Sequence, residues 1–116
     1  LKHQSLVQPA EPQIKNEFME RLTNAIQDNL ADENFGVEEL AKAVFMSSPT
    51  LRRKLAACSD LSPSNFLRHH RLEQAKLLAS KGNIRSIAEL ASSVGFAHAG
   101  YFSRLYKKTY GEVPLG

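Results

Sequence analysis

Apolar residues recur with the period of an α-helix along most of the chain. From Gln13 onward one apolar face repeats every four residues, at Ile14, Phe18, Leu22, Ile26 and Leu30. That spacing is typical of the buried face of a helix, and a polar run after Leu30 ends it. No stretch alternates apolar and polar residues over a useful length, as a half-buried strand would. The pattern therefore predicts an all-α fold with about seven helices.

Proline, serine and glycine mark the limits of the later helices. Pro49 and Pro63 each suit the first turn of a helix, where no amide hydrogen is needed. Ser62 is the expected cap of a long helix that starts at Pro63, and Gly82 is expected to end it. Shorter helices are expected at residues 37–44, 49–58, 87–94 and 100–110, the third of them opened by a capping box of Ser86 and Glu89.

Two segments of the chain repeat each other. Glu-Leu-Ala at residues 39–41 matches Glu-Leu-Ala at residues 89–91, an offset of 50. LRRKLAACSDLSP at residues 51–63 matches FSRLYKKTYGEVP at residues 102–114, an offset of 51. An insertion confined to a turn, with the register kept on both sides, is what a duplicated structural unit tolerates. Each unit reads as a helix, a short turn and a basic second helix, which is the helix-turn-helix pattern.

Composition and charge narrow the function class. No apolar run approaches the ~20 residues that span a bilayer and nothing resembles a signal peptide, so we expect the cytoplasm and no membrane contact from this segment. The single cysteine, Cys58, excludes an internal disulfide and a cysteine-based zinc cage. Residues 1–36 carry three basic and six acidic side chains, a net charge of −3, whereas residues 37–116 carry twelve and six, a net charge of +6. This asymmetry favours a polyanionic partner, although a solvated basic face remains an alternative.

With these motifs the chain resembles the AraC/XylS-type transcriptional regulators, specifically their DNA-binding domain. RLEQAKLLAS at residues 71–80, SIAELASSVGF at residues 86–96 and YFSRLYKKTYGEVP at residues 101–114 carry the resemblance. It implies two helix-turn-helix units joined by a long linker helix. The expected organisation is a linker at residues 1–12, a first unit at 13–62, the linker helix at 63–82 and a second unit at 83–116.

Geometry independently supports two recognition helices on one DNA molecule. Successive major grooves on one face of a duplex lie ~34 Å apart. A helix from Pro63 to Lys81 extends ~28 Å at 1.5 Å per residue. We therefore expect sequence-specific binding of double-stranded DNA, with the two recognition helices in successive major grooves.

The first recognition helix is expected to read bases. Inward-facing Leu51 and Leu55 turn the arginines between them outward, where each can donate a bidentate pair to guanine. The resemblance implies base contacts from three residues: Pro49, Arg52 and Arg53. Two neighbours on this helix are the expected phosphate contacts: Thr50 and Lys54.

The second recognition helix is expected to hold the DNA backbone more than to read bases. Two of its matching positions, Ala99 and Gly100, have almost no side chain with which to read a base edge. The expected base contacts are the polar residues that remain: His98, Ser103 and Arg104. Lys107 and Lys108, further along the exposed face, are the expected phosphate contacts, which fix register without carrying sequence information.

Two departures from the family pattern and three further residues need separate comment. Phe45 and Asp60 occupy positions where the family has glycine, which leaves the angle of the first recognition helix open. The resemblance implies that Arg71 is structural and braces the two halves. His69 and His70 are adjacent, so they point in different directions and make a poor metal pair.

The sequence does not indicate an enzyme. Cys58, the one candidate nucleophile of this kind, has no His or Asn at a recognisable spacing to activate its thiol. There is no phosphate loop and no metal-ligand spacing, so we expect no catalytic residue, no metal and no cofactor. The alternative function is a helical protein-interaction module whose basic face binds an acidic partner. The resemblance further implies RNA polymerase as a partner of the full-length regulator and a sensor or dimerisation domain before residue 1.

Overall fold

The computed structural model describes residues 10–115, with side chains from residue 16 onward. Within that part the chain forms six α-helices and no strand, which confirms the all-α prediction. They are α2 (Ala10–Asp28), α3 (Val37–Ala43), α4 (Ser48–Ala56), α5 (Pro63–Ser80), α6 (Ile87–Ser93) and α7 (Ala99–Tyr110). Turns and short loops join these six helices within residues 10–115.

The start of α2 differs from the sequence prediction. The helix begins at Ala10, three residues before Gln13, so residues 10–12 of the expected linker are helical. The rest of that linker, residues 1–9, lies outside the described residues, and so does the side chain of Ile14.

Serine side chains cap the N-termini of three helices. Oγ of Ser47, Ser62 and Ser86 accepts a hydrogen bond from the backbone N–H three residues later, at 3.3, 3.3 and 3.0 Å. This is the N-cap arrangement, which satisfies one of the free amides at a helix start. Ser86 and Glu89 do not form the full capping box, because Oε1 of Glu89 accepts from the backbone N–H of Arg85. The helix starts therefore follow from local sequence.

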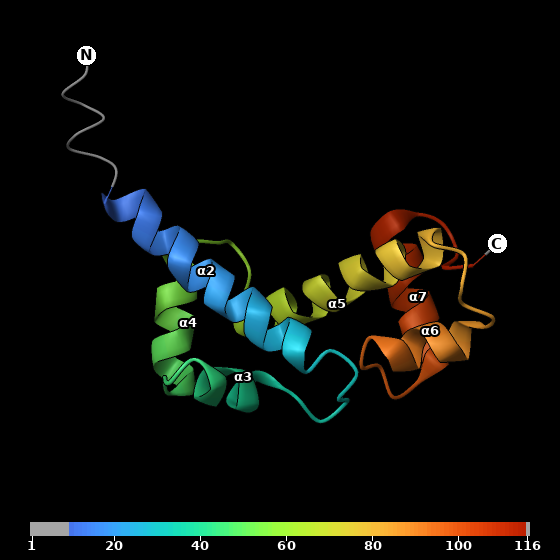
Figure 1. The fold of residues 1–116 in the computed structure, drawn as a ribbon, viewed down its shortest axis with the longest axis horizontal. Helices are drawn as coiled ribbons and strands as arrows, with labels where there is room; N and C mark the ends of the chain where they lie inside the picture. The colour runs from blue at the N-terminus through green and yellow to red at the C-terminus, as the bar shows by residue number, and fades with distance from the viewer. Residues whose placement is uncertain (1–9, 116) are drawn as a thin grey trace, which may run out of the picture.

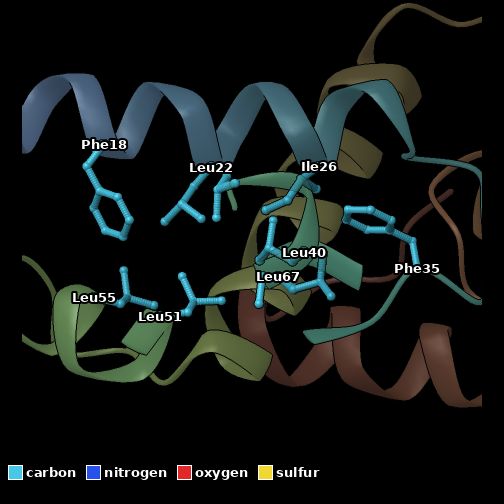
Figure 2. Close-up of a cluster of buried hydrophobic side chains, with 10 residues drawn as sticks. Phe18, Leu22, Ile26, Phe35, Leu40, Leu51, Leu55 and Leu67 are labelled. Carbon is cyan, nitrogen blue, oxygen red and sulfur yellow. The ribbon is translucent and has the colours of Figure 1, made fainter. Parts of the chain in front are cut away.

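The core of the first unit lies between α2 and the pair α3–α4. Figure 2 shows Phe18 and Leu22 of α2 pointing toward Leu51 and Leu55 of α4, with Ile26 further along the same side of α2. These side chains are the apolar faces that the sequence periodicity predicts, and all five are buried. Burying each such side chain contributes about 1.5–3 kcal/mol, so this layer fixes α4 against α2.

A second cluster holds α6 and α7 against the later half of α5. It is built on seven buried residues: Leu72, Ala75, Leu90, Ala91, Val94, Phe102 and Tyr106. Leu30, which follows α2, packs partly against both clusters. The molecule thus has one core for each helix-turn-helix unit, and the two cores meet at the linker helix.

The internal repeat of the sequence is a repeat of structure. Ala41 and Ala91 are both buried where the two helices of each unit cross. The backbone N–H of Met46 donates to the carbonyl oxygen of Ala41 at 2.9 Å, and that of Phe96 donates to Ala91 at the same distance. The extra residue of the second unit lies in its turn, between Phe96 and the first residue of α7. The two turns therefore share one design with one insertion.

The linker helix separates the two recognition helices. In Figure 1, α5 runs from the region of α4 toward α7, and these two helices lie at opposite ends of a molecule measuring 53 × 33 × 22 Å. The 18 residues of α5 span about 27 Å at 1.5 Å per residue. The separation that the sequence predicts between α4 and α7 is thus built from one continuous helix.

Arg71 of α5 ties the two units together. Its side chain is 5% exposed, and its guanidinium donates only to backbone carbonyl oxygens. From the first unit it binds Leu30, Asp32 at 3.2 Å and Phe35 at 2.9 Å, and from the second it binds Val94 at 2.8 Å. A buried guanidinium satisfied in this way is a structural brace, so the geometry agrees with the role that the sequence resemblance implies.

Candidate nucleic-acid interface

Helix α4 presents a basic outer face. Leu51 and Leu55 are fully buried, whereas Arg52, Arg53 and Lys54 are exposed. Because residues one turn apart share a face, burial of the two leucines turns the residues between them toward solvent. Pro49 is also exposed, in the first turn of the helix. Four of the five residues predicted to contact DNA on this helix therefore lie on its surface, and the fifth, Thr50, is half-buried.

A short network orients Arg53 along the start of α4. Oγ of Ser47 donates to Oγ1 of Thr50 at 3.0 Å, and Nη2 of Arg53 donates to the same Oγ1 at 3.3 Å. The guanidinium is thereby drawn toward the first turn of the helix, the part of a recognition helix that meets base edges. Thr50 thus positions Arg53, in addition to the phosphate contact predicted for it.

Lys54 lies differently from the two arginines. Its Nζ lies 5.3 Å from the centre of the Phe18 ring, a cation–π contact with α2. The ammonium is therefore turned toward α2 in this structure. To reach DNA, Lys54 must leave this contact with the Phe18 ring.

Helix α7 is anchored by aromatic side chains. Phe102 and Tyr106 are buried, with ring centres 5.8 Å apart, and Phe102 packs on Phe96 at 5.1 Å. His98 precedes the helix at the N-cap position, exposed, and its side chain makes no capping hydrogen bond. The imidazole of His98 is therefore available to a ligand at the start of α7.

Arg104 lies against the position where α7 lacks a side chain. Its Nη1 is 3.6 Å from the point that a Cβ of Gly100 would occupy. The guanidinium therefore folds back over Gly100, toward the start of the helix. A Cβ at Gly100 would make only an ordinary van der Waals contact with this guanidinium.

The remaining predicted contacts on α7 lie further along the helix. Ser103 is half-buried, and Lys107 and Lys108 are exposed in the last turn. Cations in the last turn of a helix also stabilise it through the helix dipole, so these lysines have a structural role besides any role with DNA.

Tyr101 is the surface residue that the sequence reasoning missed. Tyr101 is 44% exposed and lies between Gly100 and buried Phe102 on α7. It also lines a cleft of about 310 Å³ between the two units, together with Ser64 and Arg68 of α5. The period of α7 would have revealed it: with residues 102 and 106 inward, residue 101 faces 100° away.

The exposed cations of this face have no acidic partners of their own. Among the residues whose side chains are described, the one ion pair joins Nε2 of His69 to Oε2 of Glu73 at 3.3 Å. Five cations of the recognition helices are thus without a carboxylate partner in that part of the chain: Arg52, Arg53, Arg104, Lys107 and Lys108. Cations in this state can neutralise phosphates and release the counterions of a nucleic acid.

The turn of the first unit keeps the glycine-like conformation without a glycine. Phe45 has φ of 61° and corresponds to Gly95, which has φ of 85°. The turn that the family pattern requires is therefore made, at the cost of placing a bulky residue in the left-handed region. Asp60, the other departure from the family pattern, does not have a positive φ.

The described residues offer no other site chemistry. His69 faces Glu73, whereas Nε2 of His70 lies 3.0 Å from Oε1 of Gln27 on α2, so the adjacent histidines do point apart. From residue 16 to residue 115, no group of three His, Cys, Asp or Glu side chains is placed to hold a metal. None of the described helices has the length and apolar character to cross a membrane.

Comparison with known proteins identifies the family. Residues 40–115 match a family model described as a helix-turn-helix domain. The chain is 35% identical over 101 residues to the XylDLEGF operon transcriptional activator 1 of Pseudomonas putida, covering 85% of this chain and 30% of the activator. It is 36% identical over 89 residues to the arabinose operon regulatory protein of Escherichia coli (strain K12), covering 77% and 30%. The chain thus spans about a third of the length of these regulators.

A solved structure agrees with the sequence comparison. The C-terminal domain of the two-component response regulator yesN from Fusobacterium nucleatum is 28% identical, covers 84% of this chain and 94% of that domain, and superimposes with a TM-score of 0.73. The region matched by the family model runs from the end of α3 to residue 115, so it includes α4, α5, α6 and α7. The chain belongs to the AraC/XylS-type helix-turn-helix family, whose members are DNA-binding domains of transcriptional regulators and not enzymes.

Proposed function

We propose that this domain binds double-stranded DNA with α4 and α7 in successive major grooves on one face of the duplex. Sequence-specific DNA binding is the function of the family to which the chain belongs. The observation that carries the two-groove geometry is the pairing of two equivalent units through one helix of about 27 Å, braced by Arg71. This length is comparable to the ~34 Å between successive major grooves on one face of a duplex.

The two recognition helices have different tasks in this proposal. On α4, Arg52 and Arg53 read bases and Pro49 offers an apolar contact, while Thr50 and Lys54 contact phosphate. This assignment is supported by the exposure of both arginines and by the contact that draws Arg53 toward the first turn. Helix α4 therefore supplies most of the sequence preference.

Helix α7 binds mainly the DNA backbone and reads fewer bases than α4. Lys107 and Lys108 contact phosphates from its last turn, and the base contacts come from three residues near its start: His98, Ser103 and Arg104. The position of Arg104 over Gly100 supports this role, because the guanidinium lies near the first turn. Exposed Tyr101 adds a further polar group next to these residues.

The domain acts as the DNA-binding part of a longer regulator. This proposal is supported by the relatives, regulators about three times as long as the segment they share with this chain. In such a protein a sensor or dimerisation domain precedes residue 1, and the bound regulator contacts RNA polymerase in the cytoplasm. The family assignment favours this function over an acidic-protein-binding module.

Salt dependence of binding to a mixed-sequence duplex tests the DNA function directly. Each phosphate that the protein neutralises contributes about −0.9 to the slope of log affinity against log salt concentration. We expect retardation of the duplex at low salt and a steep loss of affinity between about 50 and 200 mM salt. Failure to retard any duplex at low salt would refute the proposal, and binding to an acidic protein alone would favour the interaction module.

A further inference from the structure

Phe45 is a side chain that neither the fold nor DNA binding explains. Its ring is 94% exposed, although it is one of the larger apolar side chains of the protein. Its φ of 61° places it in the left-handed region, which is unfavourable for a residue with a Cβ. Glycine would make the same turn without that cost, so the aromatic ring contributes nothing that the turn itself requires.

The second unit shows how the same turn is constrained elsewhere. A Cβ at Gly95 would fall 2.5 Å from the carbonyl oxygen of Leu30 and would overlap the Arg71 guanidinium. Glycine is therefore required by packing at Gly95. In the first unit Arg71 binds Asp32 and Phe35, in the loop before α3. The turn after α3 places the ring of Phe45 in solvent.

A shallow groove of about 270 Å³ lies directly beside this ring. One wall is a stripe of α2 and the residue that follows it. Its members have the i, i+3, i+4, i+7, i+8 spacing of a single helix face: Arg21, Asn24, Ala25, Asp28 and Asn29. Ala43 and Val44 line the groove on the side of Phe45. The surface therefore has a protruding ring and a neighbouring hollow, and the middle of its α2 wall is the small side chain of Ala25.

The stripe carries a positive charge at one end, on Arg21, and a negative charge at the other, on Asp28. Exposed Arg21 and Asp28 are seven residues apart, about 10.5 Å along the helix, and neither forms an ion pair among the side chains that are described. If two copies of α2 lie antiparallel with their Ala25 residues adjacent, Arg21 of each copy faces Asp28 of the other. A two-fold interface requires this kind of self-complementarity, in which each contact occurs twice.

We propose that this surface binds a second copy of the same chain about a two-fold axis near Ala25. The Phe45 ring of each copy occupies the groove of the other, and two Arg21–Asp28 pairs close the ends of the contact. The charge pattern favours a second copy over an unrelated partner, because one surface carries both the cation and its matching anion. A patch of this size buries less than a standard interface, so the association is weak. It does not depend on DNA binding.

Sedimentation equilibrium of the purified chain, from about 10 μM to 1 mM, measures this association. We expect a concentration-dependent monomer–dimer equilibrium that Phe45→Gly weakens at least tenfold. Phe45→Gly relieves the backbone strain, so the variant keeps its fold, which circular dichroism can verify. Leu77→Ala is the matched control, since Leu77 is 54% exposed on α5, outside the groove, and its removal should leave the equilibrium unchanged. A wild-type chain that stays monomeric throughout, or a Phe45→Gly variant that dimerises as well as wild type, would overturn the proposal.

Charge reversal tests the two-fold geometry itself. Arg21→Glu alone and Asp28→Arg alone each place like charges opposite each other, so each variant should dimerise at least tenfold more weakly than wild type. An equimolar mixture of the two should recover dimers, because Glu at position 21 of one copy then faces Arg at position 28 of the other. A mixture that dimerises no better than the separate variants would overturn the two-fold arrangement. Retained binding of single-site DNA by all these variants separates this result from any failure of the DNA-binding proposal.

Discussion

Nη1 of Arg71, on the linker helix, donates a hydrogen bond of 2.8 Å to the carbonyl oxygen of Val94 in the second helix-turn-helix unit. The same guanidinium binds the carbonyl oxygen of Phe35 in the first unit, at 2.9 Å. Burial lowers the pKa of Arg71, whereas the neighbouring carboxylate of Asp32 raises it. Arg71 therefore links the loop before α3 to the turn before α7. Through these two segments it also fixes the two recognition helices relative to each other.

Replacing Arg71 by methionine should destabilise the domain. Methionine fills similar space but has no donor, so the carbonyl oxygens of Phe35 and Val94 lose their charged partner inside the protein. Hydrogen bonds to charged groups contribute roughly 1.5–3 kcal/mol each, so we expect the free energy of unfolding in urea to fall by about 3 kcal/mol or more. Arg68→Met is the control, because Arg68 donates to exposed Asn65 on its own helix. Equal effects of the two changes would contradict the bracing role of Arg71.

The two glycines Gly95 and Gly82 should respond differently to alanine. Both have positive φ, but a Cβ at Gly82 meets nothing within 4 Å, whereas one at Gly95 overlaps Arg71. Gly82→Ala should therefore cost only the backbone term, about 1 kcal/mol, and Gly95→Ala about 3 kcal/mol or more. Thermal and urea denaturation of the two variants measure this difference. Similar losses would mean that the turn of the second unit is not packed against the brace.

Local sequence was sufficient to predict most of the fold. The periodic faces of α2 and α4, the caps Ser62 and Ser86, and the repeat all reflect interactions within a few residues or between equivalent positions. All of them are present in the structure. Contacts between segments that are distant in the sequence could not be predicted in this way. The hydrogen bonds of Arg71, the cation–π contact of Lys54 with Phe18 and the exposure of Tyr101 depend on how the helices pack, which the spacing of apolar residues does not specify.

Arg53 and Lys107 should have separable effects on DNA binding. Arg53→Ala removes a base-reading guanidinium, so it should cost about 1–3 kcal/mol on the preferred sequence and relax the preference at one position. Lys107→Ala should weaken preferred and scrambled duplexes about equally and reduce the salt slope by about 1. Competition binding at several salt concentrations measures both quantities. If both variants lose the same affinity on the two duplexes, the division of tasks between α4 and α7 is wrong.

The stability of the domain should fall as the medium is acidified, in part because of His70. Burial lowers the pKa of this imidazole, although Glu73 opposes the shift, so the unfolded chain binds its proton more readily than the folded chain. The contribution of neutral His70 is therefore complete above about pH 6.5 and is lost as the pH falls from there through the folded-state pKa. His70→Gln keeps a polar partner for Gln27 without titrating, so urea denaturation at pH 7.5 and pH 5 should show a smaller loss for the variant than for wild type. If the free energy of unfolding falls equally in both proteins, His70 does not contribute to the acid sensitivity.

The central claim, that one chain reads two elements in successive grooves, is tested most directly by changing the spacing of those elements. Duplexes selected from a random pool should contain two elements about 10 bp apart, one helical turn of DNA. Inserting about 5 bp between them moves one element to the opposite face of the duplex, where α5 cannot carry α7 to it. We predict that affinity then falls to that of a duplex with one element alone. Unchanged affinity after the insertion, measured with the same protein and salt, would contradict simultaneous binding by the two recognition helices.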